Sequence, residues 1–209
     1  MSQPTTIRVL IVDDHAIVRR GLATIINRDP EMTVVAQAED GQQAIDVFRE
    51  YQPDVTLMDL SMPKMGGVEA ITAICAEFRQ ARITVLTTYD GDEDIYRGLQ
   101  AGAQGYLLKD AKPHELLNAI RTIHSGQKYV PPAVGAKLLQ RMSHPELSER
   151  ELAVLRLMAQ GMSNADIATR LSIGESTVKS HINRLLSKLG VSDRTQAVIV
   201  AVKRGLVSL

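Results

Sequence analysis

The sequence predicts an α/β domain built on a doubly wound, five-stranded parallel sheet, followed by a small all-α domain. Five short apolar runs alternate with amphipathic stretches up to Ser125, and beyond that residue only helical patterns continue. Three of the runs are almost continuously apolar, which is typical of strands that helices cover on both faces. The expected strands are Ile7–Val12, Thr33–Ala38, Val55–Met58, Ile83–Leu86 and Gly105–Leu108.

The stretches between these runs have helical spacing, as the apolar residues Val18, Leu22 and Ile25 show at i, i+4 and i+7. We place the α/β domain at residues 1–125 and a linker at 126–145, which is rich in Pro and Gly. Within this linker a short helix is expected at Val134–Met142.

Residues 146–209 are predicted to form helices only. Two capping boxes mark expected helix starts, at Ser148-x-x-Glu151 and Ser163-x-x-Asp166. Three glycines stand where helices are expected to end: Gly161, Gly174 and Gly190.

Composition narrows the class of protein. With 209 residues the chain has room for two separate cores. No apolar run approaches the roughly 18 residues of a membrane span, and the first residues show no secretory signal. The single cysteine, Cys75, cannot form an internal disulfide and fits a reducing compartment. We therefore expect a cytoplasmic protein without a membrane partner.

The net charge of zero hides a difference between the two domains. Residues 1–125 carry 12 Lys and Arg against 18 Asp and Glu, whereas residues 146–209 carry 9 against 6. The first domain is therefore acidic and the last one basic, which indicates different partners and makes a polyanion such as DNA plausible for the second.

Polar residues follow four of the predicted strands. Asp13 and Asp14 end the first strand, Asp59 the third, Thr87 the fourth and Lys109 the fifth. The carboxyl ends of parallel strands share one edge of a doubly wound sheet, where ligands bind at the switch in strand order. We expect these side chains to converge there, with Lys109 at the rim.

Carboxylates that lie close together repel one another and need a cation. A small hard ion such as Mg²⁺ takes oxygen ligands, and a carboxylate beside it can act as a nucleophile toward phosphorus. Lys109 can pair with an incoming phosphoryl group, and Thr87 can donate a hydrogen bond to it. The competing interpretation is that Asp13 and Asp14 only cap the following helix.

Residues 163–189 have the pattern of a helix, a tight turn and a second helix, the latter at Glu175–Leu189. The second helix has an apolar stripe, formed by Val178, Ile182, Leu185, Leu186 and Leu189. Its opposite arc carries Ser176, Ser180, Asn183, Arg184 and Ser187, flanked by Lys179 and His181. This arc has no acid after Glu175, which suits a DNA major groove, and Ser176 and Thr177 at the helix start can bind phosphate. Considered alone, it also fits an ordinary solvated helix.

Three segments of the first domain strongly resemble receiver domains of two-component response regulators, which have a flavodoxin-like fold: Val12-Asp13-Asp14-His15, Leu57-Met58-Asp59-Leu60-Ser61-Met62-Pro63 and Gly105-Tyr106-Leu107-Leu108-Lys109. The resemblance implies that Asp59 accepts a phosphoryl group from a partner histidine kinase. It implies Mg²⁺ ligation by Asp14 directly, by Asp13 through water, by Asp59, and by the backbone carbonyl of Ser61. It also implies that Thr87 and Tyr106 form a switch pair.

The last domain resembles LuxR-type helix-turn-helix domains, through Leu147-Ser148-Glu149-Arg150-Glu151, Thr177-Val178-Lys179-Ser180-His181-Ile182 and Lys188-Leu189-Gly190. A receiver followed by this domain is the NarL/FixJ-type architecture. The resemblance implies that Lys179, Ser180 and Asn183 face the DNA groove, and that a last helix at about Arg194 to Arg204 pairs two copies on DNA. The DNA-contact candidates are Ser176, Thr177, Lys179, Ser180, Asn183, Arg184 and Lys188, and the dimerisation candidates are Val198, Ile199 and Val202.

These observations predict a response regulator, a sequence-specific transcription factor rather than an enzyme, switched by Mg²⁺-dependent phosphorylation of Asp59. One alternative is a phosphorylation-independent DNA-binding regulator whose receiver serves as a dimerisation platform. Another is an aspartyl-phosphate hydrolase, although Ser61 stands where haloacid-dehalogenase-type phosphatases need a second acid.

Overall fold

The computed structural model describes residues 6–88, 92–142, 147–204 and 206–207. The chain divides into two compact units, Met1–Leu139 and Gln140–Leu209. The predicted fold class is confirmed, because the first unit contains a five-stranded parallel sheet and the second unit is helical. In the part of the chain that the structure describes, no helix is long and apolar enough to span a membrane.

The sheet of the first unit has the strand order β2-β1-β3-β4-β5, and every neighbouring pair is parallel. The strands are β1 (Ile7–Val12), β2 (Met32–Ala38), β3 (Val55–Met58), β4 (Ile83–Thr87) and β5 (Gly105–Leu108). Three of them have the predicted bounds, while β2 starts one residue earlier and β4 ends one residue later, at Thr87. The chain crosses from β2 over β1 to β3, so the switch in strand order lies between β1 and β3.

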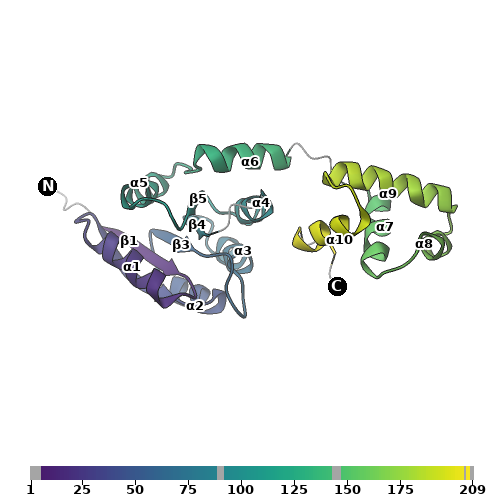
Figure 1. Cartoon of the computed structure of the whole chain (residues 1–209). Helices are drawn as coiled ribbons and strands as arrows, with labels where there is room; N and C mark the ends of the chain where they lie inside the picture. The colour runs from purple at the N-terminus through teal and green to yellow at the C-terminus, as the bar shows by residue number, and fades with distance from the viewer. Residues whose placement is uncertain (1–5, 89–91, 143–146, 205, 208–209) are drawn as a thin grey trace. The chain divides into compact units, whose positions relative to one another are not determined.

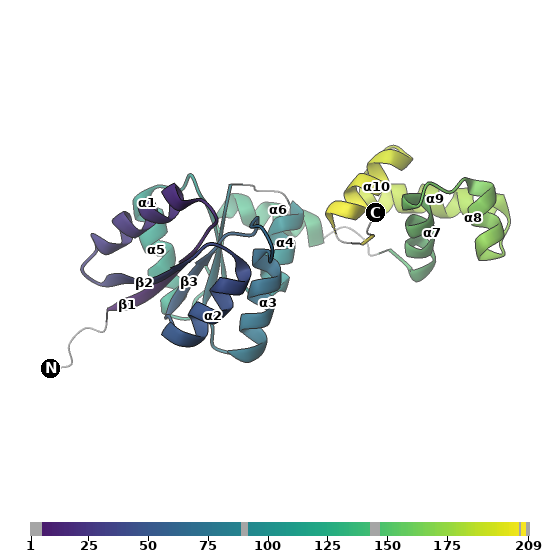
Figure 2. The same ribbon diagram turned by 90° about the horizontal axis from the view of Figure 1, so that it is seen from below.

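Helices cover both faces of this sheet (Figures 1 and 2). Helices α1 (Ala16–Asn27) and α5 (Pro113–His124) pack on one face. The other face is covered by α2 (Gly41–Tyr51), α3 (Gly67–Glu77) and α4 (Asp92–Gln100). This two-sided cover is what a doubly wound sheet requires.

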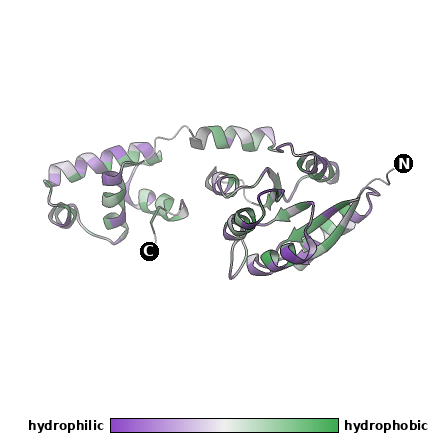
Figure 3. Ribbon diagram, turned by 180° about the vertical axis from the view of Figure 1, so that it is seen from behind, coloured by the Kyte–Doolittle hydropathy of each residue, from purple (hydrophilic) through white to green (hydrophobic). Residues whose placement is uncertain are grey.

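The core of the first unit consists of two apolar clusters, one on each face of the sheet. Successive residues of β1 alternate between them: Leu10 and Val12 join the cluster under α2, α3 and α4, and Val9 and Ile11 join the one under α1 and α5. Both faces of the sheet are therefore buried under helices. This explains why the strand sequences are almost continuously apolar and why the strands are mainly green in Figure 3.

Helix α6 (Pro132–Met142) follows the first unit's sheet and starts two residues before the predicted helix. Its residue Val134 is buried with 2% exposure in the cluster under α2, α3 and α4. The division between the two units falls inside this helix, after Leu139. The first half of α6 therefore shares the core of the α/β unit.

The second unit contains α7 (Glu149–Ala159), α8 (Asn164–Leu171), α9 (Glu175–Leu189) and α10 (Arg194–Lys203). Both predicted capping boxes are formed, one at Ser148 and Glu151 and one at Ser163 and Asp166. The apolar stripe of α9 packs into a core of this unit's own, in which Val178, Leu185 and Leu189 are buried.

One of the predicted helix ends is wrong. Gly174 is the N-cap of α9, with an extended φ of −70°, whereas α8 already ends at Leu171. Ser172 takes the left-handed C-cap conformation instead, with a φ of 53°, and its N–H donates to the carbonyls of Ala168 and Thr169. The turn between α8 and α9 is short, and Gly174 lies directly before α9, where it serves as the N-cap. Glycine is also common at N-cap positions. Gly161 and Gly190 do follow helices in the left-handed region.

An ion pair joins α7 to α9 inside the second unit. The Glu151 side chain is 4% exposed, and its Oε2 lies 2.7 Å from Nζ of Lys188. Burial opposes ionisation of Glu151, but hydrogen bonds from Lys188 and Ser148 outweigh it and hold the pKa of this carboxyl below its ordinary value. The pair fixes α9 against the helix on which it packs.

We predict that Glu151→Gln lowers the free energy of unfolding of the second unit by ~2 kcal/mol at pH 7, because it removes a charged hydrogen bond from a buried site. Because the pKa of Glu151 is lower in the folded protein than in the unfolded chain, its ionised form stabilises the fold fully at pH values above about 4.5, the ordinary pKa. This contribution is lost as the pH falls through the lower pKa of the folded state. The difference between wild type and Glu151→Gln should therefore shrink as the pH falls below 4.5. Residue-resolved hydrogen exchange measures both quantities. Glu149→Gln, an exposed change in the same helical turn, is the control, and an equal loss in that variant would contradict the prediction.

Candidate functional site

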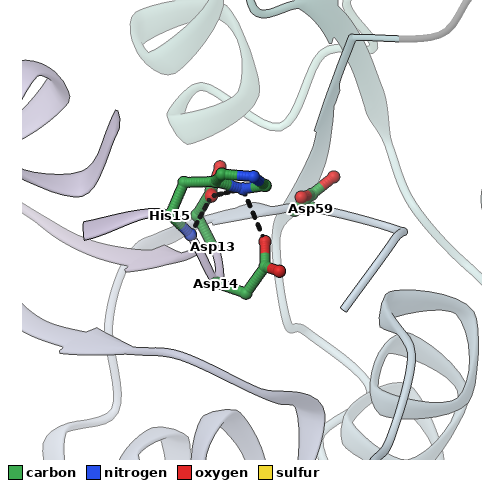
Figure 4. Close-up of side chains that lie close together, drawn as sticks. All are labelled: Asp13, Asp14, His15 and Asp59. Atoms are coloured by element: carbon green, nitrogen blue, oxygen red, sulfur yellow. Dashed lines mark hydrogen bonds and ion pairs between the residues drawn. The ribbon is translucent and has the colours of Figure 1, made fainter. Parts of the chain in front are cut away.

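The carboxyl edge of the sheet brings the predicted polar residues together. Asp13 follows β1 and Asp59 follows β3, the two strands at the switch in strand order. The ladder continues one residue beyond the strands, because Asp59 N–H donates to the Val12 carbonyl at 2.9 Å and Asp13 N–H to the Ala38 carbonyl at 3.1 Å. The two carboxylates are thus held on adjacent strands (Figure 4).

Lys109 joins the two acids. Its Nζ lies 2.7 Å from Asp13 Oδ2 and 2.7 Å from Asp59 Oδ2. The side chains of Lys109, Asp13 and Asp59 are 10%, 1% and 3% exposed, so the lysine is partly buried and lies over two buried acids. Its flexible stem lets the ammonium reach both carboxylates.

The electrostatics of this group follow from its burial. Desolvation raises the pKa of Asp59, aided by the charge of Asp13, while Lys109 acts in the opposite direction. For Lys109 burial would lower the pKa, but ion pairs with Asp13 and Asp59 raise it above its ordinary value. The ammonium therefore stays charged at neutral pH.

His15 is a member of this site that the sequence analysis missed. Its Nδ1 lies 2.7 Å from Asp14 Oδ1 and 3.3 Å from Asp13 Oδ1 (Figure 4). Together with Asp59, these residues offer ligand atoms that all lie within 4.8 Å of one another. Its place directly after two acids at a strand end was the signal in the sequence that could have found it.

The competing interpretation of the two acids as helix caps is not what the structure shows. The N-cap of α1 is His15, and its side chain makes no capping hydrogen bond among the described residues. The Asp13 carboxylate accepts from His15 N–H at 2.8 Å, one step before the helix starts. Asp13 instead pairs with Lys109, and Asp14 pairs with His15.

The donor set fits a hard divalent cation. Asp13, Asp14 and Asp59 supply carboxylate oxygens, the ligands that Mg²⁺ prefers. In the structure the Lys109 ammonium lies 2.7 Å from Asp13 Oδ2 and compensates the charge of this buried oxygen. Asp14 is the most exposed acid of the three, and its carboxylate lies within reach of the same divalent cation.

The loop after β3 is tightly anchored around Asp59. Ser61 N–H donates weakly to Asp59 Oδ1 at 3.4 Å, so the loop curls back over the acid and keeps the Ser61 backbone at the pocket. Gly67 N–H donates to the Leu60 carbonyl at 3.0 Å. A Cβ on Gly67 would lie 2.0 Å from the backbone oxygen of Asp59, so only glycine allows this approach.

Thr87 and Tyr106, the predicted switch pair, are both buried, with exposures of 2% and 0%. Tyr106 belongs to the cluster under α2, α3 and α4, together with Ile95 of α4. Lys109 N–H donates to the Thr87 carbonyl at 2.8 Å, which links the end of β4 to the pocket lysine.

Helix α9 presents most of the predicted DNA-contact residues to solvent. Six of them are exposed: Ser176, Thr177, Lys179, Ser180, Asn183 and Arg184. The ammonium of Lys179 lies 3.2 Å from the carboxylate of Glu175, an exposed pair that solvent weakens. Lys188 differs from the other six because its ammonium is engaged by the buried Glu151. We therefore assign Lys188 to the packing of α9 and leave it out of the DNA contacts proposed below.

The predicted dimerisation residues of α10 fall into two groups. Ile199 and Val202 are exposed, at 52% and 36%, whereas Val198 is partly buried against the core of the second unit. An apolar surface of two residues is thus available on this helix.

Comparison with known families matches both units. Residues 9–121 match the response regulator receiver domain, and residues 145–201 match the luxR family of bacterial regulatory proteins. The transcriptional regulatory protein LiaR of Bacillus subtilis is 42% identical over 210 residues, covering 97% of this chain and 100% of LiaR.

Solved structures of RcsB from Salmonella typhimurium are also similar. One has a TM-score of 0.83 at 29% identity, covering 93% of this chain and 98% of that chain. Another, solved with RcsB bound to a promoter in the presence of the phosphomimetic BeF3−, has a TM-score of 0.77 at 28% identity, covering 95% and 99%.

We predict that Gly67→Ala destabilises the first unit by ~1–3 kcal/mol, because the new Cβ forces the backbone at Asp59 to move. Gly21→Ala is the matched control: this helical glycine has open space around its Cβ position, so alanine should stabilise by about 0.5–1 kcal/mol. Chemical unfolding of both variants gives the two values. Equal stability of Gly67→Ala and wild type would show that the loop is not constrained as described.

Proposed function

The chain belongs to the response regulators that join a receiver domain to a DNA-binding domain of the luxR family, and from this premise we propose that phosphorylation of Asp59 controls its binding to specific DNA sites. In this proposal residues 1–125 act as the receiver, 126–145 as the linker and 146–209 as the DNA-binding domain. The observation that carries it is the buried group of Asp13, Lys109 and Asp59.

The proposed chemistry is transfer of a phosphoryl group from a phosphohistidine of a sensor kinase. A carboxylate oxygen of Asp59 attacks phosphorus, the P–O bond forms, the P–N bond breaks, and its electron pair stays on the histidine ring. Lys109 releases its contact with Asp59 and pairs with an oxygen of the phosphoryl group. Asp13, Asp14, Asp59 and the Ser61 carbonyl would hold Mg²⁺, which when bound neutralises charge on the transferred group.

The proposed signal starts at Thr87 and Tyr106. The Thr87 hydroxyl can donate a hydrogen bond to a phosphoryl oxygen, because β4 ends at this residue on the pocket edge. The Tyr106 ring lies inside the apolar cluster, where it would follow the displaced β4 end. Phosphorylation acts by adding charge to one state and thereby shifting a conformational equilibrium.

DNA is the proposed partner of α9, with the exposed arc around Ser180 and Asn183 in the major groove. Ser176 and Thr177 lie at the helix start, where N–H groups favour phosphate, and Lys179 and Arg184 supply charge. RcsB has been solved as dimers bound to DNA, which supports a homodimer on two half-sites, paired here through Ile199 and Val202 with Val198 beneath them. We place this activity in the cytoplasm.

We predict that a small phosphodonor with Mg²⁺ adds one base-labile phosphoryl group to the wild-type chain and none to Asp59→Ala, because this acid is the buried nucleophile beside Lys109. Intact-mass spectrometry before and after mild alkali measures the transfer. Asp54→Ala is the control, since Asp54 precedes β3 at the opposite edge of the sheet. Labelling of Asp59→Ala at the wild-type level would refute the assignment, and unchanged DNA affinity after full phosphorylation would favour the phosphorylation-independent alternative.

We predict different losses for two residues of α9. Lys179→Ala should weaken binding to all sequences alike and lower the salt slope by about 1, because the ammonium meets phosphate. Asn183→Ala should cost ~1–3 kcal/mol on the preferred site only, because an amide reads a base edge. Binding isotherms at several salt concentrations, on the preferred site and on random DNA, separate the two.

The control for these variants is Arg156→Ala, which removes an exposed cation from α7 and should leave both the affinity and the salt slope unchanged. Equal losses for Asn183→Ala on specific and random DNA would contradict base recognition by this helix.

A further inference from the structure

The segment that follows α5 occupies the outer edge of β5. Tyr106 N–H donates to the Tyr129 carbonyl at 2.8 Å, and Tyr129 N–H donates to the Gln104 carbonyl at 3.2 Å. These bonds form a parallel bridge between Tyr129 and Gly105. The edge of β5 would otherwise expose unpaired backbone groups, so Tyr129 supplies a short sixth strand position to the sheet.

The side chains of this segment alternate as those of a strand do. Tyr129 packs against the cluster under α1 and α5, and Val130 packs against the opposite cluster. Five residues after Tyr129, the buried Val134 of α6 belongs to the same cluster as Tyr106, and Leu138 packs against that cluster in part. The segment that contains Tyr129 and Val134 therefore contacts Tyr106 in two ways, through the backbone hydrogen bond of Tyr129 and through the apolar cluster that includes Val134.

We propose that residues 129–138 are a positioning element of the switch, which transmits a displacement of Tyr106 to α6 through the Tyr129 bridge and the buried Val134. This inference rests on the proposed function, because it needs Tyr106 to respond to phosphorylation of Asp59. Tyr106 cannot shift along β5 without lengthening its hydrogen bond to Tyr129, and its ring cannot move without changing the cavity that Val134 helps to fill. Phosphorylation of Asp59 would therefore change how favourably α6 packs on the first unit. The end of α6 already belongs to the second unit.

The test compares two truncations on one helix. Val134→Ala removes a buried contact with the Tyr106 cluster, whereas Leu139→Ala removes a side chain that is 68% exposed. The full chain is titrated with its preferred DNA, with and without beryllofluoride and Mg²⁺, and the ratio of the two dissociation constants is the activation ratio. Beryllofluoride affinity is measured separately, since Asp59, Asp13 and Lys109 are intact in both variants.

We expect Val134→Ala to reduce the activation ratio by at least about fivefold with unchanged beryllofluoride affinity, and Leu139→Ala to match wild type. Tyr106 N–H should also exchange faster with solvent in Val134→Ala. A wild-type activation ratio in Val134→Ala, or a loss of beryllofluoride binding in it, overturns the inference. A wild type that ignores beryllofluoride would instead refute the proposed function, so the two failures are distinguishable.

A second pair of variants guards against unfolding of Val134→Ala. Tyr129→Pro removes the N–H that bonds to the Gln104 carbonyl together with the ring, and Tyr129→Phe keeps both. The inference requires a reduced activation ratio for the first and a wild-type ratio for the second, and equal ratios would overturn it.

Discussion

The paired contacts of the Lys109 ammonium with Asp13 and Asp59 are the interaction on which the candidate site of the first unit depends. The fold brings Asp13 and Asp59 to adjacent strand ends, where two carboxylates with exposures of 1% and 3% would repel one another. One lysine at 2.7 Å from both removes this repulsion, but a buried ion pair gains little net stability after desolvation. Such a group contributes little to stability, and it suits a site in which the ammonium exchanges one anionic partner for another.

The surrounding structure holds this group in place. The acids lie together because the strand order changes between β1 and β3, and the loop after Asp59 is fixed by the contact that only Gly67 permits. The same loop is anchored to the start of α2, where Gly41 N–H donates to the Met65 carbonyl at 3.0 Å and Lys64 pairs with the buried Asp40 at 2.7 Å. A preorganised pocket loses less free energy when it binds a charged group, since little must be rearranged.

Much of the fold could be predicted because its signals are local. Strand runs such as Val55–Met58 and the two capping boxes lie within a few residues of the elements they define, and α9 has the predicted bounds. The convergence of Asp13, Asp59 and Lys109 also followed, since the carboxyl ends of parallel strands share one edge.

Other features depend on neighbours that are distant in sequence. Lys109 pairs with Asp59, 50 residues away in the sequence, and Lys188 pairs with Glu151, 37 residues away. No local pattern indicates either pair. The bridge of Tyr129 to β5 has no local pattern, because the segment around it reads as a Pro-rich linker. The Gly174 error arose because glycine suits both ends of a helix, and only the geometry of Ser172 decides between them.

Helix α9 owes its shape to contacts within its own unit. Its apolar stripe packs into a separate core, Glu151 and Lys188 tie it to α7, and Arg150 donates to the Leu171 carbonyl at the turn that precedes it, at 2.8 Å. None of these contacts involves the receiver, so under the proposed function phosphorylation has no need to build the recognition surface. In this proposal phosphorylation changes the fraction of molecules in which two copies of α9 can reach DNA together. This is a shift between existing conformations and requires no folding of α9. The segment from Tyr129 to Leu138 shares the core of the first unit and leads out of it, which is why we propose it as the part of the chain that carries such a shift.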